Sequence, residues 1–355
     1  MKSILVTGGA GFIGSHTCFS LLKKGYKLYV IDSFINSSKE SLIKVLDTLK
    51  FYNIDAINNL TIISGDIKDK GLLREVFQKS KIDKNPIESV IHFAGLKSVS
   101  ESVRNPILYW DSNLNSSVSL FQIMCEFNCS IIVFSSSATI YGLLNKSPIN
   151  ESGEICPINP YGNSKYAIET LLKDIFLSSN KKMKVANLRY FNPVGAHPLG
   201  FIGEDPKGIP NNIFPLITKV AIGKIEKLKI FGKDWPTKDG TGIRDYIHVM
   251  DLAEGHIRML EFLSENDPQL INMNLGTGVG TSVLELIETF KKVNNVNIPY
   301  EFVGRRSGDV AEIVADNSYA KELINWFPRR SLYDICKDGF NWQSNNPDGF
   351  LKKLS

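Results

Sequence analysis

The sequence predicts an α/β protein with a doubly wound parallel sheet, followed by a smaller α/β domain. Short apolar runs typical of buried strands alternate with helical segments, which favours a parallel sheet covered by helices. A glycine-rich turn directly follows the first run, and an acid ends the second, Leu28–Ile31. This order of elements is typical of a Rossmann dinucleotide-binding unit.

Composition indicates an ordinary globular protein. The 355 residues carry a formal net charge of +4, and no stretch gathers enough Lys and Arg for a nucleic-acid surface. No apolar run approaches the ~20 residues that a membrane helix needs. The first run, Met1–Thr7, passes straight into glycines, so we expect no signal peptide. We therefore expect neither a nucleic-acid partner nor a membrane protein.

The five cysteines lack the spacing of a zinc site. An odd and scattered set fits a reducing compartment, so we expect a cytoplasmic protein without a metal centre. The cysteines are Cys18, Cys125, Cys129, Cys156 and Cys336.

The glycine-rich turn is the first candidate site. It runs from Gly8 to Gly14 and opens a helix predicted over about 15–24. Glycines let the backbone approach a pyrophosphate, and the helix N-terminus offers N–H groups to it. Asp32 can accept hydrogen bonds from the adenosine ribose hydroxyls, and its charge would repel a 2′-phosphate. We therefore expect NAD rather than NADP.

Later strands place more candidates at the same edge of the sheet. Residues 61–63, 89–95, 130–134 and 184–189 all have the pattern of buried strands. Ligands of such sheets bind at the carboxyl ends of the strands, so one crevice is expected to gather the residues that follow them. These residues are the glycine turn, Asp32, Asp66, Ala94, Gly95, Ser137 and Tyr190–Asn192.

A change of composition after Asn192 predicts a domain division. Gly and Pro become frequent between Pro193 and Pro210, which is typical of a loop-rich region. We expect a NAD-binding Rossmann domain over 1–192 and a smaller second domain over 193–355, to which the family resemblance given below assigns UDP-sugar binding. The segment 245–275 contains a helical stretch and an apolar run, and we expect it to return to the first domain.

Tyr161 and Lys165 are the catalytic candidates. They stand four residues apart at the start of a predicted helix, so both side chains lie on one face. A positive charge within ~4–6 Å lowers the pKa of a phenol, which makes Tyr161 a general base with Lys165 as its activator. The pair alone is weak evidence, because the same spacing occurs on ordinary solvated helices.

Longer blocks make the case specific. They are His92–Lys97, Phe134–Gly142, Arg189–His197 and Asp239–Leu252. With the glycine turn and the set of Ser137, Tyr161 and Lys165, these blocks resemble the UDP-galactose 4-epimerase family of the extended short-chain dehydrogenase/reductase superfamily. The resemblance extends from the first residues to beyond Arg306, almost the whole chain.

The resemblance implies a role for each matching position. The catalytic residues are Ser137, Tyr161 and Lys165. The NAD-binding residues are Gly8, Gly11, Phe12, Ile13, Gly14, Asp32, Asn36, Ser37, Asp66, Ile67, Phe93, Ala94, Gly95, Lys97, Tyr161, Lys165 and Tyr190. The substrate-binding residues are Ser137, Tyr161, Asn192, Asn212, Phe231, Arg244, Arg306, Asp309 and Ile313. The chain departs from the family at Ser112, where Asn is common.

The implied activity interconverts UDP-glucose and UDP-galactose by transient NAD-dependent oxidation at sugar C4. A UDP-N-acetylglucosamine 4-epimerase or a dual-specificity enzyme is the alternative. A nucleotide-sugar 4,6-dehydratase is disfavoured, because Ala138 and Thr139 cannot supply the additional acid and base that elimination needs. A non-catalytic NAD-sensing protein on the same fold has no need of an intact Ser137, Tyr161 and Lys165 set.

Two further expectations rest on the resemblance alone. Ile313 falls where a bulky Tyr goes with unsubstituted hexoses and a smaller residue admits N-acetylhexosamines, so we expect the UDP-glucose pair with some activity on N-acetylhexosamines. Family members usually dimerise through two helices per subunit. Here these are the helix after Tyr109 and the one carrying Tyr161, so we expect a homodimer.

Overall fold

The computed structural model divides the chain into two compact units. Unit 1 comprises 1–142, 155–189 and 253–273, and unit 2 comprises 143–154, 190–252 and 274–355. The structure describes residues 2–208, 210, 212–306 and 308–350. The last five residues of the expected second domain lie outside that part of the chain.

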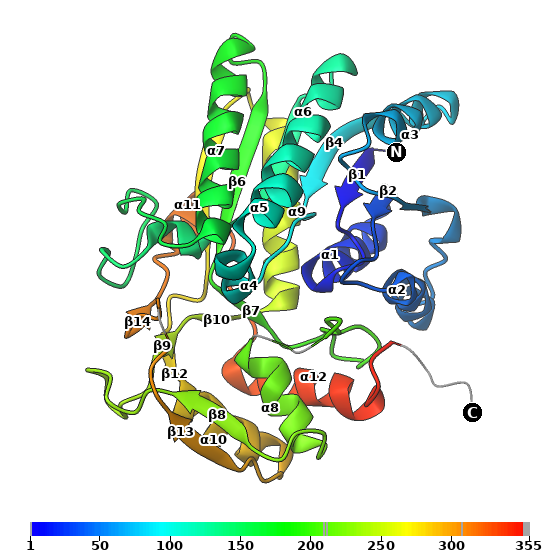
Figure 1. Cartoon of the computed structure of the whole chain (residues 1–355). Helices are drawn as coiled ribbons and strands as arrows, with labels where there is room; N and C mark the ends of the chain where they lie inside the picture. The colour runs from blue at the N-terminus through cyan, green and yellow to red at the C-terminus, as the bar shows by residue number, and fades with distance from the viewer. Residues whose placement is uncertain (1, 209, 211, 307, 351–355) are drawn as a thin grey trace. The chain divides into compact units, whose positions relative to one another are not determined.

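A seven-stranded sheet forms the centre of unit 1 (Figure 1). Its strand order is β11-β6-β5-β4-β1-β2-β3, and the pairs β1–β2, β2–β3, β1–β4 and β4–β5 are parallel. The order reverses direction at β1 and β4, which is the point where doubly wound sheets bind ligands. The predicted fold class is therefore confirmed. The strands are β1 Ser3–Thr7, β2 Lys27–Asp32, β3 Leu60–Ser64, β4 Ile87–His92, β5 Ile131–Ser137, β6 Lys184–Tyr190 and β11 Leu270–Leu275.

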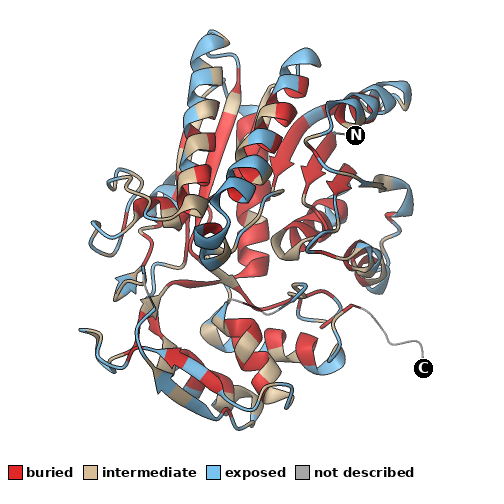
Figure 2. Ribbon diagram, viewed as in Figure 1, coloured by how far each residue is buried: buried red, intermediate tan, exposed pale blue. Residues whose placement is uncertain are grey.

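The strands are apolar because helices cover them on both faces. Side chains of α3, α6 and α7 form one core with the strands, and α9 passes behind the strands that α6 and α7 cover from the front in Figure 1. Figure 2 shows the strands mostly buried and the outer helix faces exposed. The helices are α1 Phe12–Lys23, α2 Lys39–Phe51, α3 Lys70–Ile82, α4 Val99–Arg104, α5 Pro106–Tyr109, α6 Ser116–Glu126, α7 Pro160–Ser178 and α9 Val249–Glu265, with short turns at Ile57–Asn59, Trp110–Asn115 and Ala138–Tyr141.

Local signals fix the start of α7, the helix that carries the catalytic candidates. The Asn159 side chain accepts a hydrogen bond from the Gly162 N–H at 2.9 Å. Pro160 occupies the first helical position, where its missing N–H leaves no bond unmade. An Asn cap followed by Pro therefore sets which residues face the sheet.

In the residues of unit 2 that the structure describes, short strands are combined with the helices α8, α10, α11 and α12. Its apolar core joins α8, α10 and α12 to β8. Both α10 and α12 begin with a capping box, at Ser282 and Ser331, which satisfies N–H groups at the helix start. The elements are β7 Asn192–Val194, α8 Ile213–Ala221, β8 Leu228–Phe231, β9 Ile243–Arg244, β10 Tyr246–His248, β12 Thr281–Ser282, α10 Val283–Asn294, β13 Tyr300–Val303, β14 Glu312–Ile313, α11 Ser318–Ile324 and α12 Leu332–Asn345.

Small pairings organise these strands. Parallel pairs join β7 to β10 and β8 to β13, and β9 lies between β12 and β14. Across both units, no helix among the described residues has the length and apolarity to cross a membrane.

Candidate active site

The glycine turn joins β1 to α1 in unit 1. Two of its glycines are required by packing, because a Cβ on Gly8 would lie 2.6 Å from the Ala94 nitrogen and one on Gly14 would lie 2.4 Å from the Gly8 oxygen. Gly11 differs. It is the N-cap of α1 with an ordinary φ of −71°, and a Cβ there would meet only the Gly8 oxygen at 3.4 Å. Packing does not demand glycine at this helix start, so the open space fits the close approach of a pyrophosphate.

Asp32 ends β2 and is nearly buried. Its Oδ1 accepts hydrogen bonds from the Phe34 N–H at 2.9 Å and the Ser37 hydroxyl at 2.7 Å. Its Oδ2 accepts one bond, from the Ala10 N–H at 2.9 Å. A carboxylate has about four accepting positions, so Oδ2 keeps capacity for a ribose hydroxyl. The protein thus holds the acid in place and leaves one acceptor for a ligand.

The other predicted cofactor residues of unit 1 follow the ends of β2, β3 and β4. Asp66 accepts the Lys68 N–H at 2.9 Å, and its neighbour Ile67 is buried. Phe93 lies 4.8 Å from the His256 ring, measured between centroids. The remaining members lie in the loops after β2 and β4, and they are Asn36, Ser37, Ala94, Gly95 and Lys97.

The catalytic candidates meet at the end of β5. Ser137 is the last residue of β5, and its hydroxyl lies close enough to the Tyr161 phenol to lower the pKa of that phenol. The Lys165 Nζ donates to the Ser135 carbonyl at 2.8 Å and lies 5.8 Å from the centroid of the Tyr161 ring. One strand and one helix therefore bring all three side chains together.

Burial sets the electrostatics of this group. It raises the pKa of Tyr161, and the nearby Ser137 hydroxyl opposes this rise. The net direction is opposite to the one predicted from the spacing of Tyr161 and Lys165, because desolvation outweighs the other influences. Burial also lowers the pKa of Lys165 to about 8, against the pull of Glu169. Lys165 is therefore mostly charged at neutral pH, but its pKa lies close enough to neutral that a small further decrease would remove part of the charge.

Two residues that support this group were not predicted. Thr139 donates its hydroxyl to the Ser137 Oγ at 3.0 Å. Asn113 is buried in the π-helical turn Trp110–Asn115, where it accepts the Leu96 N–H at 2.7 Å and donates to the Ser164 hydroxyl at 3.0 Å. The polar residue Asn113 gave no distinct signal, because its inward direction depends on the π-helical geometry.

The predicted substrate residues of unit 2 include two arginines around one acid. The Arg306 Nη2 lies 2.9 Å from an Asp309 oxygen, and the Arg244 Nη2 lies 3.7 Å from the same oxygen. Burial lowers the pKa of Arg244, and the charge of Asp309 opposes this. Two guanidinium groups that converge in this way can bind a diphosphate.

Other predicted substrate residues lie around this pair or elsewhere in unit 2. The Phe231 ring is 42% exposed and lies 5.6 Å from the Arg306 guanidinium carbon. Ile313 of β14 is the register partner of Arg244 in β9. The remaining positions are Tyr190 at the end of β6, Asn192 at the start of β7 and Asn212 at the N-cap of α8.

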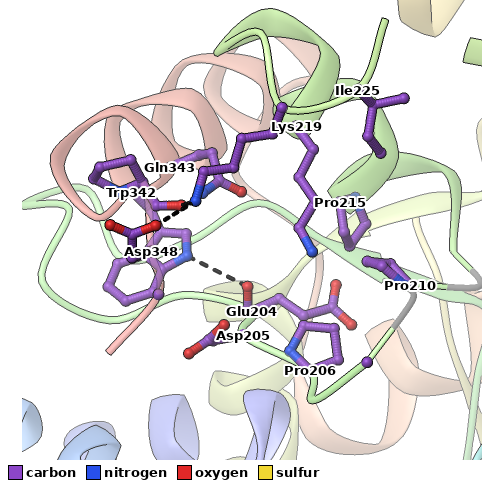
Figure 3. Close-up of a pocket in the computed structure, with 14 residues that line it drawn as sticks. Glu204, Asp205, Pro206, Pro210, Pro215, Lys219, Ile225, Trp342, Gln343 and Asp348 are labelled. Atoms are coloured by element: carbon purple, nitrogen blue, oxygen red, sulfur yellow. Dashed lines mark hydrogen bonds and ion pairs between the residues drawn. The ribbon is translucent and has the colours of Figure 1, made fainter. Parts of the chain in front are cut away.

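A cavity of about 410 Å³ in unit 2 is lined by other residues (Figure 3). None of the predicted site residues is among the described residues that line it. Figure 3 shows polar groups of its wall joined to each other, including the Trp342 indole to the Glu204 carbonyl at 3.4 Å. Lys224 and Asp348 form an ion pair at 2.6 Å. The cavity therefore lacks the arrangement of the catalytic group.

A sheet with a glycine turn, a terminal acid and a Ser-Tyr-Lys group indicates a short-chain dehydrogenase/reductase type of enzyme. A family model described as GDP-mannose 4,6 dehydratase matches residues 5–339. UDP-glucose 4-epimerase from Bacillus subtilis is 48% identical over 348 residues, covering 98% of both chains. UDP-glucose 4-epimerase 2 from Arabidopsis thaliana is 46% identical and covers 98% of this chain and 97% of its own.

A solved structure agrees with these relatives. The UDP-glucose 4-epimerase from Bifidobacterium longum in complex with NAD+ and UDP has a TM-score of 0.91 and 42% identity, covering 98% of this chain and 100% of its own. The chain belongs to the GDP-mannose 4,6 dehydratase family, and within it to the UDP-glucose 4-epimerases. The resemblance predicted from the sequence is confirmed.

Proposed function

We propose that this chain interconverts UDP-glucose and UDP-galactose with NAD as cofactor, using the catalytic group of unit 1. The observation that carries the proposal is the grouping of Ser137 at the end of β5 with Tyr161 and Lys165 of α7, where the Lys165 Nζ lies 5.8 Å from the centroid of the Tyr161 ring. The 48% identity to an epimerase supports the substrate. The matching family is described by a dehydratase, but we do not propose dehydration for this chain. Elimination needs an additional acid and base, whereas Ala138 is apolar and buried and the Thr139 hydroxyl is bound to Ser137.

The residues of unit 1 move the proton. Tyr161 takes the proton of the sugar 4-hydroxyl, and Ser137 binds the same oxygen and relays the proton. The Lys165 ammonium stabilises the phenolate against the effect of burial. NAD, held by the glycine turn and Asp32, would supply the acceptor and donor of the C4 hydride.

Residues around both parts of the ligand hold it in place. Gly11 and the start of α1 receive the cofactor pyrophosphate, and Asp32 receives the ribose. Arg244 and Arg306 clamp the diphosphate of the substrate, so the 4-keto sugar can turn while the nucleotide stays bound. Phe231 stacks near the uracil.

We also propose that Ile313 gives the enzyme some activity on UDP-N-acetylhexosamines. Isoleucine is shorter than a tyrosine, and Ile313 is the register partner of Arg244 within the predicted substrate cluster. UDP-glucose and UDP-galactose remain the main pair. Turnover of UDP-N-acetylglucosamine equal to that of UDP-glucose would reverse this order.

We also propose that the protein forms a homodimer, because apolar side chains are exposed around α7. The helices α4 and α5 and the π-helical turn contact α7, and together they expose apolar side chains to solvent. Ile107 is 84% exposed and Val103 is 62% exposed, and patches of this kind mark association sites. The exposed large apolar side chains of these elements are Val99, Val103, Ile107, Leu108, Trp110, Tyr166 and Leu177. Light scattering that gives a dimer mass, and a monomer mass for Ile107→Glu, is the expected result.

The five cysteines are all unpaired, and a cytoplasmic location is proposed on that basis.

The activity is tested by incubating the purified protein with UDP-galactose, without added NAD. UDP-glucose is the expected product, since NAD that is regenerated in each turnover need not leave. Failure to form UDP-glucose even with NAD supplied would overturn the proposal.

A further inference from the structure

A buried ion pair lies directly behind the catalytic group. Glu169 stands one helical turn after Lys165 on α7, and it is 5% exposed. Its two carboxylate oxygens accept hydrogen bonds from Arg189, with Nε at 3.1 Å and Nη2 at 2.7 Å. Arg189 of β6 is 3% exposed and also donates from Nη1 to the Tyr141 hydroxyl at 3.0 Å. The pair therefore joins α7, β6 and the turn Ala138–Tyr141.

The same carboxylate holds the end of β5. The Ser136 hydroxyl donates to the Glu169 Oε1 at 2.5 Å. Ser136 stands between the two residues of β5 that touch the catalytic side chains. The carbonyl of Ser135 accepts a hydrogen bond from the Lys165 ammonium at 2.8 Å, and the hydroxyl of Ser137 lies close enough to Tyr161 to act on its pKa. A shift of Ser136 relative to α7 would move both of these contacts.

We propose that Glu169 is a positioning residue for the epimerase reaction: through Ser136 and Arg189 it holds the end of β5 against α7 and so sets the places of Ser137 and Lys165 relative to Tyr161. The inference rests on the proposed function. Burying two charges costs desolvation energy that their attraction often does not repay. A fully bonded buried network does, however, fix one arrangement of the elements that it joins, and here those elements carry the catalytic side chains.

Glu169 also acts on the charge of Lys165. Burial lowers the pKa of Lys165 to about 8, and the carboxylate of Glu169 opposes this. The titratable groups that face Lys165 are Tyr161 and Glu169 on α7 and His92 on β4. Burial, with a smaller effect of Lys165, lowers the pKa of His92 to about 3, so His92 stays neutral. Among these groups, Glu169 is the anion that keeps Lys165 protonated.

The test compares four variants of the full chain. Glu169→Gln removes the charge and keeps the shape, whereas Glu169→Asp keeps the charge and withdraws it by one methylene. Ser136→Ala removes the hydrogen bond between Glu169 and β5 without changing either member of the ion pair. It tests the positioning role if Glu169→Gln does not fold. Leu172→Ala is the control, because Leu172 is fully buried on the same helix and takes no part in the network.

Four quantities are measured for each variant: kcat and KM with UDP-galactose across pH, the melting temperature, and the pH midpoint of Lys165 acetylation. Trace acetic anhydride with peptide mass spectrometry gives that midpoint without any need for activity. Glu169→Gln is expected to lower kcat ~10²-fold with KM within about twofold. It should also shift both the alkaline limb of kcat and the Lys165 midpoint down by about one pH unit.

The other variants separate position from charge. Glu169→Asp should leave the Lys165 midpoint close to wild type, and Ser136→Ala should lower kcat about tenfold with the midpoint unchanged. Leu172→Ala should lower only the melting temperature. The proposal is overturned if Glu169→Gln keeps the wild-type kcat and midpoint and only melts earlier, as the control does.

Failure of the proposed function would give a different result. If the wild-type protein does not convert UDP-galactose, the pH midpoint of Lys165 acetylation can still be compared between the variants, because it does not depend on activity. A midpoint lowered in Glu169→Gln and unchanged in Leu172→Ala supports the action of Glu169 on the charge of Lys165, and equal midpoints in both overturn it.

Discussion

Replacing Lys165 by methionine is expected to change how stability depends on pH. Lys165 is 4% exposed, and burial lowers its pKa from the ordinary 10.5 to about 8. In the unfolded chain the pKa returns to the ordinary value, so the unfolded state binds more protons between pH 8 and 10.5. The contribution of Lys165 to the free energy of unfolding therefore rises with pH across that window.

The magnitude follows from the same numbers. Each pH unit of lowered pKa corresponds to ~1.4 kcal/mol, so the drop to about 8 destabilises the fold by about 3 kcal/mol below pH 8. Lys165→Met removes this cost. Relative to the wild type, the variant should gain about 3 kcal/mol at pH 7, less the lost bond to the Ser135 carbonyl, and this gain should vanish toward pH 10.5.

Urea unfolding of the nucleotide-free proteins at pH 7, 8, 9 and 10 measures this difference. All other titrating groups are common to both proteins, so they cancel when the two free energies are subtracted. A difference between the two proteins that stays flat from pH 7 to 10 would refute the argument. It would mean that Lys165 is not desolvated in the folded state.

Three other predictions concern ligands. Asp32→Asn should weaken NAD binding about tenfold and improve NADP binding, because the charge facing the ribose is lost; calorimetry that finds the NAD to NADP ratio unchanged would contradict this. Arg306→Leu should raise KM for UDP-galactose ~10–100-fold with a smaller effect on kcat, while Arg305→Leu, which removes a guanidinium stacked on Trp235 at 4.1 Å, should change KM little. Ile313→Tyr should lower kcat/KM for UDP-N-acetylglucosamine relative to UDP-glucose about tenfold, and a constant ratio would remove Ile313 from the substrate site.

Much of the structure of unit 1 could be predicted from the sequence, because the sequence patterns that indicate its elements are local. The glycine turn, the acid that ends β2 and the buried strands each depend on spacing over a few residues. The strands of unit 2 are only two to four residues long, too short for a periodic pattern. The segment 143–154 belongs to unit 2 although the residues on both sides of it belong to unit 1. A bridge between Ile149 and Ala315 joins this segment to a distant part of the chain, and no local sequence pattern predicts such a pairing.

The catalytic site shows the same limit. Ser137, Tyr161 and Lys165 were found by spacing and motif. Glu169 stands four residues after Lys165, on the same helix face, and an acid at that position of an otherwise apolar run was a signal that the spacing argument left unused. The direction of the Tyr161 pKa was predicted wrongly, because the extent of burial is a property of the folded chain.

The central claim is that the hydride at sugar C4 leaves and returns within one active site while Tyr161 moves the proton. UDP-galactose with deuterium at C4 tests it most directly, with NMR detection of the label in the UDP-glucose formed in ordinary water. The account predicts that the deuterium stays at C4 and that Tyr161→Phe lowers the rate of conversion ~10²–10⁴-fold. Loss of the deuterium to water, or full activity of Tyr161→Phe, would contradict it.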